Sequence, residues 1–343
     1  ALHTNNFYLY GGLFDTIAEL IPLITPLDGF GARRLANASI GLLALVGAWK
    51  TARLLAGPQA GFWALLFLIA TPVWYGHTFI NAKDIPLAAG YIWSLYFIIK
   101  ITGNLPEMSW GTAAGLGAAF GLSIGIRVGG VLVVFYFFMM IGLYLLEARI
   151  NVKQAQNLKL IDTGFLYKVI MSLVIAWTMM VAFWPKVLLY PVTGIIDALL
   201  ASNRFRWGGD VLYNGLYINA SELPWHYLPV YFGVKLPIPI LLIFFIGIAW
   251  ALLRIIQNAR QLEWSPVAGK SLLVFAIVFP PVYAISTGAI VYDGVRHFLF
   301  IIPPMACLAG VAIAELMPRI GKRFKQASFF LYSAFGCYLV FHT

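Results

Sequence analysis

The sequence predicts an all-α protein that crosses the membrane as a bundle of about ten helices. Three properties of the 343-residue chain point to this fold: 61% of the residues are hydrophobic, 10% are charged, and the mean hydropathy is +0.86. A water-soluble fold carries far more charge, about a quarter of its residues, and could not cover this much apolar surface. The apolar stretches are continuous rather than alternating, which excludes a porin-like barrel.

A membrane-spanning helix needs about 20 mostly apolar residues, and ten segments come close to this requirement. We expect spans at 36–54, 60–76, 86–101, 109–126, 128–147, 168–185, 237–256, 271–289, 297–316 and 326–342. The stretch 108–147 has one charge before its last residue, and as a single helix it would be about 60 Å long, twice the bilayer core. We therefore expect the chain to turn back at Arg127-Val128-Gly129-Gly130. Gly117, Gly121 and Gly125 before that turn predict a closely packed helix pair.

The basic residues predict the orientation. If segment 36–54 runs inward, 14 of the 23 basic and five of the 13 acidic residues lie inside, which gives net charges of +9 inside and +1 outside. This positive-inside bias accounts for the overall charge of +10, so we expect no nucleic-acid partner. Cys307 and Cys337 lie in apolar runs and imply neither a disulfide framework nor a zinc site.

We expect one transmembrane domain over residues 1–343. Residues 1–35 are expected to be the remainder of a first outer loop, with an interfacial helix around 7–24. Residues 186–236 form a second, long outer loop. The chain lacks an initiator Met and ends inside an apolar run, which suggests that both ends are cut from a longer protein.

Charged residues gather at the predicted outer mouths of the spans. They are Lys83, Asp84, Arg127, Lys235, Asp293 and Arg296. A helical bundle brings its outer ends together, so these charges are expected to ring one site at the membrane surface. The alternative is that they anchor the interface and pair with one another, because unpaired charges at a lipid boundary are costly.

The segment 76–86 is the most informative local feature. Asp84 precedes a helix whose first turn holds Pro86. Its carboxylate is therefore a helix cap, a metal ligand or a partner for a substrate hydroxyl. His77 and Asn81 precede it on the same segment. A divalent metal stays open as a cofactor, although no second histidine lies at ligand spacing from His77.

Two further segments carry candidate binding residues. The loop before the seventh span holds Glu222, Trp225, His226 and Tyr227. Its aromatic side chains either form an interfacial belt or stack on a sugar or line a lipid groove. Arg296 and His297 open the ninth span beside Asp293. The guanidinium fork suits a phosphate, and the alternative is a surface ion pair worth little.

Taken in order, these motifs resemble those of the GT-C glycosyltransferases. The nearest branch is that of the dolichyl-phosphate-mannose protein mannosyltransferases and the bacterial aminoarabinose transferases of lipid A. The resemblance rests on Tyr10-Gly11-Gly12-Leu13-Phe14, Asn81-Ala82-Lys83-Asp84-Ile85-Pro86, Gly125-Ile126-Arg127-Val128-Gly129-Gly130, Leu223-Pro224-Trp225-His226-Tyr227-Leu228-Pro229-Val230, Lys235-Leu236-Pro237 and Arg296-His297-Phe298-Leu299-Phe300-Ile301-Ile302-Pro303-Pro304. It covers nearly the whole chain. One departure is that the family carries an Asp-Glu pair after a first span, and neither Asp15 nor Glu19 matches it.

The resemblance implies a GT-C-like bundle that moves a sugar from a polyprenyl phosphate to an acceptor on the outer face, with inversion. Asp84 is then an assisting acid, because the main first-loop acid is absent. The donor phosphate is bound by Lys83, Arg127, Lys235 and Arg296, and the substrates by His77, Asn81, Glu222, Trp225, His226, Tyr227, Asp293 and His297. The implied partners are the lipid-linked sugar, membrane lipid and an acceptor protein, glycan or lipid. The implied location is a bacterial inner membrane, with the site facing the periplasm.

Two other functions remain open at this point. A secondary transporter or lipid flippase would place ionisable residues near the bilayer midplane and show repeated, broken helices. A non-catalytic subunit would explain the missing acid pair. The sequence gives neither the sugar nor the acceptor, and neither the metal dependence nor the oligomeric state.

Overall fold

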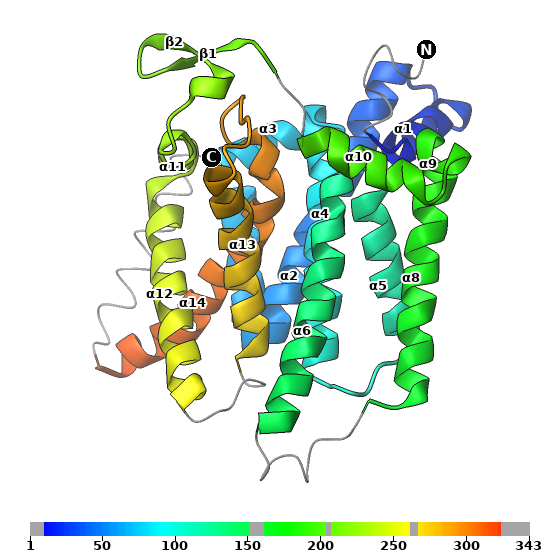
Figure 1. Ribbon diagram of the computed structural model, residues 1–343. Coiled ribbons are helices and arrows are strands. Elements are labelled where there is room, and N and C mark those ends of the chain that lie inside the picture. The colour runs from blue at the N-terminus through cyan, green and yellow to red at the C-terminus, as the bar shows by residue number, and fades with distance from the viewer. Residues whose placement is uncertain (1–9, 151–160, 204–206, 261–266, 324–343) are drawn as a thin grey trace.

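The structure, a computed structural model, describes residues 10–150, 161–203, 207–260 and 267–323. Its long helices run side by side as a bundle, and short helices cover one end (Figure 1). That end carries α1, α3, α9, α10, α11 and the only described strands, and it corresponds to the side predicted to be outside. It is referred to below as the outer end. The all-α prediction is confirmed apart from one short hairpin.

The elements follow one another from α1 near the amino end to α14. The helices are α1 (Leu13–Leu20), η2 (Ile21–Leu23), α2 (Gly29–Ile69), α3 (Pro72–Ile80), α4 (Asp84–Thr102), α5 (Trp110–Ile124), η3 (Val128–Gly130), α6 (Val131–Ile150), α8 (Thr163–Phe183), α9 (Pro185–Leu189), α10 (Thr193–Asn203), η4 (Ala220–Glu222), α11 (Tyr227–Lys235), α12 (Ile238–Arg260), α13 (Ala268–Ser286), η5 (Arg296–Ile301) and α14 (Ile302–Arg323). The strands are β1 (Asp210–Tyr213) and β2 (Leu216–Asn219), paired antiparallel.

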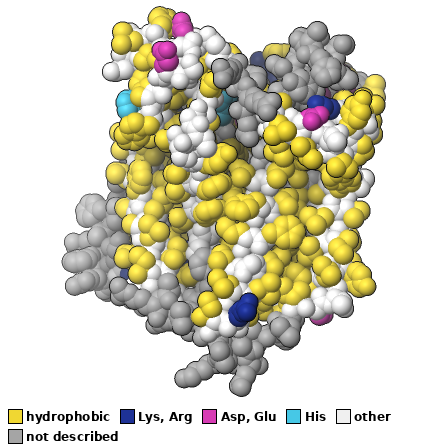
Figure 2. Space-filling view, in the orientation of Figure 1, with side chains coloured by type: hydrophobic (Ala, Val, Ile, Leu, Met, Phe, Trp, Pro, Cys, Tyr) yellow, Lys and Arg dark blue, Asp and Glu magenta, His cyan; other side chains and the backbone are white. Residues whose placement is uncertain are grey.

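Seven of the described helical segments are long and apolar enough to cross a membrane. The side of the bundle seen in Figure 2 is mostly hydrophobic along its length, and its charged side chains lie toward the two ends. These features, with the composition, identify an integral membrane protein. The predicted spans from 86–101 to 297–316 coincide with α4, α5, α6, α8, α12, α13 and α14. The predicted span 326–342 lies outside the described residues.

The 41 residues of α2 form two arms rather than one rod. The backbone leaves the helical region at Ala56 and at Gly57, where φ is +83°. The second arm then starts at Pro58, whose missing N–H costs nothing at a helix start. A Cβ on Gly61 would lie 2.9 Å from the Trp49 carbonyl oxygen, so the arms pack face to face. The predicted spans 36–54 and 60–76 are thus two passes.

The prediction for 60–76 is wrong in one respect. The second arm ends at Ile69, and Thr71 is extended before Pro72 starts α3. The Thr71 hydroxyl donates a hydrogen bond to the Phe67 carbonyl, one turn earlier, at 2.7 Å. The residue before a proline is pushed out of the helical region, which explains the break. Because of this break, α3 is a separate short helix at the outer end rather than a continuation of α2.

Small residues allow the helices to approach closely. A Cβ atom on Gly117 would lie 2.6 Å from the carbonyl oxygen of Ser172 on α8. A Cβ atom on Gly310 of α14 would lie 2.5 Å from the carbonyl oxygen of Ala60 on α2. The Cys307 thiol donates to the Ala48 carbonyl at 3.2 Å, so α14 contacts both arms of α2. The predicted close packing is confirmed for Gly117 and Gly121, which lie against α8, whereas Gly125 lies near Leu13 of α1 instead. The predicted turn at Arg127 is confirmed, because η3 separates α5 from α6 there.

The outer loops differ from the sequence prediction in their secondary structure. The loop 186–236 contains α9, α10, the β1–β2 hairpin, η4 and α11. The interfacial helix expected around 7–24 is shorter, because α1 begins at Leu13 and η2 ends at Leu23. Leu23 is 76% exposed, as a side chain facing lipid would be.

A tyrosine compensates for a proline inside α13. Pro280 has no N–H, so the Ala276 carbonyl one turn earlier loses its helical hydrogen bond. The buried hydroxyl of Tyr91, on α4, donates to this carbonyl at 2.7 Å. The Tyr136 hydroxyl, on α6, lies 3.2 Å from that of Tyr91. Because lipid offers no hydrogen bonds, this contact holds α13 against α4.

We predict that Tyr91→Phe lowers the free energy of unfolding in detergent by about 1 kcal/mol, since the Ala276 carbonyl loses its partner. The measurement is denaturant or thermal unfolding of the purified protein. Tyr96→Phe is the matched control on the same helix, because its hydroxyl has no hydrogen-bond partner among the described residues. Equal stability of the two variants would contradict the proposed compensation.

Candidate functional site

The corner between α3 and α4 holds Asp84 in a fixed orientation. The Asn81 Oδ1 atom accepts hydrogen bonds from the backbone N–H of Lys83 at 3.3 Å and of Asp84 at 2.9 Å. Asn81 Nδ2 donates to Asp84 Oδ2 at 2.7 Å. The side-chain amide of Asn81 therefore caps the start of α4. The carboxylate of Asp84 does not serve as the cap and contacts other groups.

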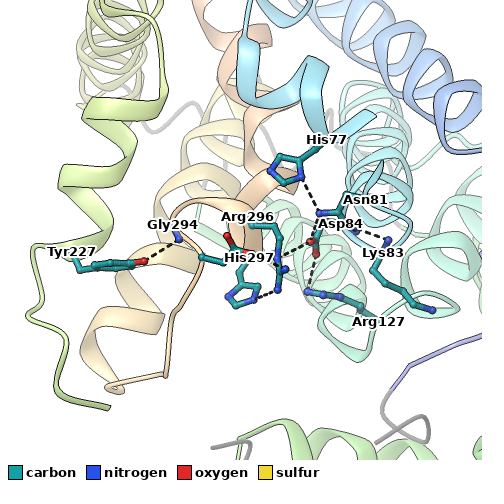
Figure 3. Close-up of polar contacts among 10 residues, drawn as sticks. His77, Asn81, Lys83, Asp84, Arg127, Tyr227, Gly294, Arg296 and His297 are labelled. Carbon is teal, nitrogen blue, oxygen red and sulfur yellow. Dashed lines mark hydrogen bonds and ion pairs between the residues drawn. The ribbon is translucent and has the colours of Figure 1, made fainter. Parts of the chain in front are cut away.

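Those groups are two arginines from distant parts of the chain (Figure 3). Asp84 is 3% exposed. Its Oδ1 lies 2.8 Å from Nη1 of Arg127, and its Oδ2 lies 3.6 Å from Nε of Arg296. Arg296 also pairs with Asp293 at 2.7 Å. One buried carboxylate thus joins the start of α4, the turn after α5 and the start of η5.

The two arginines keep unused hydrogen-bonding capacity. Within the described residues, the buried Nε atoms of Arg127 and Arg296 have no hydrogen-bond partner. A buried donor without a partner costs about 1–3 kcal/mol, so such donors usually serve a ligand or water. Donors of this type, in planar guanidinium groups, match the oxygens of a phosphate.

His77 completes the polar group on the α3 side. Its Nδ1 lies 3.2 Å from Asn81 Nδ2. Burial lowers the pKa of His77 below its ordinary value, although Asp84 and Asp293 act in the opposite direction. A neutral ring can accept the second amide hydrogen of Asn81, since the first goes to Asp84. The α3 backbone here is held by Asn37, which donates to the His77 carbonyl at 3.1 Å.

The first outer segment forms another wall of this site. Lys83 Nζ lies 2.9 Å from Asp15 Oδ2, and Arg33 pairs with the other oxygen of Asp15. Burial acts to raise the pKa of Asp15, but hydrogen bonds from Lys83 and Arg33 outweigh it and lower that pKa. The ring of Tyr10 lies 5.7 Å from Lys83 Nζ and 5.5 Å from the Arg127 guanidinium carbon.

This wall was only partly predictable. Tyr10 belongs to a motif that carries the family resemblance, and its backbone forms an isolated β-bridge with Arg127. Asp15 and Arg33 were not predicted as site residues. Asp15 contacts Lys83, which is 68 positions away in the sequence, and Arg33, which is 18 positions away. No local sequence pattern predicts these contacts. The sequence does show that Asp15 is an acidic residue within the first outer segment.

A turn before η5 forms the opposite side of the site. Asp293 and Gly294 adopt φ values of +66° and +61°. The Gly294 N–H donates to the Tyr227 hydroxyl at 2.9 Å, and burial raises the pKa of that hydroxyl. His297 Nε2 lies 3.2 Å from Nη2 of Arg296. Tyr227 therefore supports the turn that positions Arg296.

The structure does not bring every candidate residue into this cluster. It unites His77, Asn81, Lys83, Asp84, Arg127, Asp293, Arg296 and His297, with Tyr227 at the edge. Glu222, Trp225 and His226 are exposed, and the His226 ring contacts the Tyr213 hydroxyl instead. Lys235 is exposed at the end of α11, and its positive charge contributes to lowering the pKa of His77. The described residues include no group of three or more His, Cys, Asp or Glu side chains placed to hold a metal ion.

Comparison with known proteins supports the family resemblance. Residues 16–177 match the family model described as dolichyl-phosphate-mannose-protein mannosyltransferase. Comparison with curated protein sequences gave no match.

Solved membrane enzymes share the fold. ArnT from Cupriavidus metallidurans bound to undecaprenyl phosphate superimposes with a TM-score of 0.58 at 17% identity, over 96% of this chain and 54% of that one. The apo state of the same protein superimposes with a TM-score of 0.56 at 18% identity, over 92% of this chain and 51% of that one. A third match is the archaeal oligosaccharyltransferase AglB from Archaeoglobus fulgidus, solved in complex with an inhibitory peptide and a dolichol-phosphate. It superimposes with a TM-score of 0.57 at 10% identity, over 97% of this chain and 46% of that one.

The chain therefore has a GT-C-like fold and resembles the branch of the protein mannosyltransferases and ArnT. It spans about half the length of the solved structures that it matches.

We predict that acidification weakens the outer end through His77. Because the folded-state pKa of His77 is lowered, the unfolded chain binds more protons below about pH 6.5, and stability falls as pH decreases through that range. The measurement is the thermal unfolding temperature between about pH 7.5 and about pH 5. His77→Gln should reduce the slope. Identical slopes in wild type and His77→Gln would refute the role of this ring.

Proposed function

We propose that this chain belongs to an integral-membrane glycosyltransferase that moves a sugar from a polyprenyl-phosphate donor to an acceptor at the outer end of the bundle. The observation that carries the proposal is the buried Asp84 carboxylate between Arg127 and Arg296. The likeness to proteins solved with undecaprenyl phosphate and dolichol-phosphate supports it.

Charge at the outer end matches such a donor. On the predicted outer side, nine basic residues stand against eight acidic residues. The excess of one positive charge complements the single negative charge of a sugar phosphodiester. We propose that Arg127 and Arg296 bind its oxygens, because their buried Nε atoms have no hydrogen-bond partner among the described residues.

The proposed reaction is a single displacement at the sugar. A hydroxyl or amine of the acceptor attacks the anomeric carbon, and the bond from that carbon to the phosphate oxygen breaks. The electron pair leaves with the phosphate, where Lys83, Arg127 and Arg296 stabilise the developing charge. The proton of the acceptor passes to a carboxylate, and Asp84 assists. A single displacement of this kind inverts the anomeric centre.

The donor's isoprenoid chain requires an apolar path along the bundle. A groove of about 450 Å³ lies between α6 and α13 and is lined by Met139, Leu143, Phe275 and Phe279 among other apolar side chains. It starts on α6 about 18 Å below the Arg127 turn, which suits a long lipid tail. The tail is proposed to leave the phosphate site toward this groove.

The alternative of a transporter or flippase has less support. A transporter places its ionisable residues near the bilayer midplane. Asp84 instead begins α4 directly after α3, and α3 lies at the outer end of the bundle (Figure 1). We further propose that the site faces the periplasm of a bacterial inner membrane and that the acceptor is a protein, a glycan or a lipid.

We predict that Asp84→Asn and Arg296→Ala each reduce sugar transfer by the full-length protein at least about 100-fold, because each removes charge that positions or stabilises the phosphate. The measurement is transfer from a polyprenyl-phosphate sugar in reconstituted membranes. Asp210→Asn, at an exposed position of the hairpin, is the control for loss of an outer acid and should retain activity. Near-wild-type transfer by both site variants would disprove the assignment.

A further inference from the structure

Arg296 has two acidic neighbours that differ in their exposure to water. The side chain of Asp84 is 4% exposed, whereas that of Asp293 is 55% exposed. Asp84 Oδ2 lies 3.6 Å from Nε of Arg296, and Asp293 Oδ2 lies 2.7 Å from its Nη1 atom. The shorter of the two ion pairs is therefore the one that water reaches.

The buried neighbour is held in place from several sides. Asp84 accepts a hydrogen bond from Asn81 at 2.7 Å and lies 2.8 Å from Arg127. Figure 3 shows these side chains and Arg296 converging on its carboxylate. An exposed ion pair is weak by comparison, because water competes for both partners. Arg296 thus has one fixed counter-ion, Asp84, and one exchangeable counter-ion, Asp293.

The backbone that carries Asp293 is fixed, although its carboxylate is exposed. Asp293 and Gly294 have φ values of +66° and +61°. The Gly294 N–H donates to the Tyr227 hydroxyl at 2.9 Å, and a Cβ atom on Gly294 would lie 2.8 Å from Cδ1 of Tyr231. Because α11 holds this turn, the Asp293 carboxylate can leave Arg296 and return to it by rotation of its own side chain.

A phosphate on Arg296 competes with this carboxylate. The Nη1 atom of Arg296 contacts Asp293, and its Nη2 atom lies 3.2 Å from His297 Nε2. The buried Nε atom has no hydrogen-bond partner among the described residues. A phosphate oxygen can therefore bind Nε while Asp293 stays in place, but an oxygen that contacts Nη1 must displace Asp293.

The charge of the bound phosphate changes during the transfer proposed above, on which this inference rests. The donor is a phosphodiester with one negative charge. When the bond from the anomeric carbon to the phosphate oxygen breaks, the electron pair stays on that oxygen. The product is then a phosphomonoester, whose charge at neutral pH is about −1.5 to −2. The arginines hold this product more strongly than the donor, so its release is favoured by a group that competes for them.

We propose that Asp293 promotes release of the polyprenyl-phosphate product by competing with it for Arg296. While a phosphate occupies Nη1, Asp293 is left without its cation beside a second anion. It repels a phosphomonoester more than a phosphodiester, because the repulsion grows with the charge of the ligand. As the product leaves, the Asp293 carboxylate pairs with Arg296 again.

The test compares two short-chain probes, farnesyl phosphate and its methyl phosphodiester. Their dissociation from the immobilised full-length protein in detergent is measured by surface plasmon resonance. Asp293→Asn removes the charge but keeps a side chain that tolerates positive φ. It should slow the dissociation of farnesyl phosphate about fivefold, the scale of one exposed ion pair, and that of the methyl diester about twofold at most.

Three further variants make the result specific. Arg296→Gln removes the contested cation, and adding Asp293→Asn to it should change the dissociation of either probe by less than about twofold. Asp210→Asn, at an exposed acid of the hairpin, is the matched control and should leave both dissociation rates unchanged. Asp293→Gly also tolerates positive φ and should reproduce the effect of Asp293→Asn, which guards against misfolding of one variant.

The outcomes separate this inference from the proposed function. Equal effects of Asp293→Asn on the two probes overturn the inference, because Asp293 would then only obstruct the site. Unchanged dissociation of farnesyl phosphate from Asp293→Asn overturns it as well, and the proposed function then stands. Failure of the wild-type protein to bind either probe would instead refute the proposed phosphate site, and the inference with it.

Discussion

The outer end of this protein is organised around one buried carboxylate. Asp84 has almost no contact with solvent, yet it faces guanidinium groups from two other segments of the chain. Removing a carboxylate from water is costly, and the cost is met only when cations and hydrogen bonds surround it. Asn81, Arg127 and Arg296 provide these contacts. The same contacts fix the positions of the arginines, which would otherwise repel each other, as the proposed phosphate site requires.

Much of this arrangement could be predicted because polar residues are rare in an apolar chain. Each predicted span that falls in the described residues has a helical counterpart, since long uncharged stretches have few alternatives in lipid. Asp84, Arg127 and Arg296 all follow or precede such spans on the same predicted side. The positive-inside rule was therefore sufficient to place them at one end of the bundle, although not to pair them.

Other features depend on tertiary contacts that the sequence does not encode locally. The attachment of Lys83 to Asp15 and the bond from Tyr91 to the Ala276 carbonyl join distant residues without a recurring pattern. The β1–β2 hairpin is different, because a local signal for it is present in the sequence. Asn214-Gly215 is the sequence that a tight turn prefers, and both residues have positive φ values, of 52° and 81°.

The central claim is that the Asp84 cluster binds the phosphate of a lipid-linked sugar. The most direct measurement is a cryo-EM map of the full-length protein with a polyprenyl phosphate bound in a lipid nanodisc. The account predicts phosphate density within hydrogen-bonding distance of both Arg127 and Arg296. A lipid phosphate resolved elsewhere on the outer end, with the ion pairs of Asp84 undisturbed and no density beside these arginines, would contradict it.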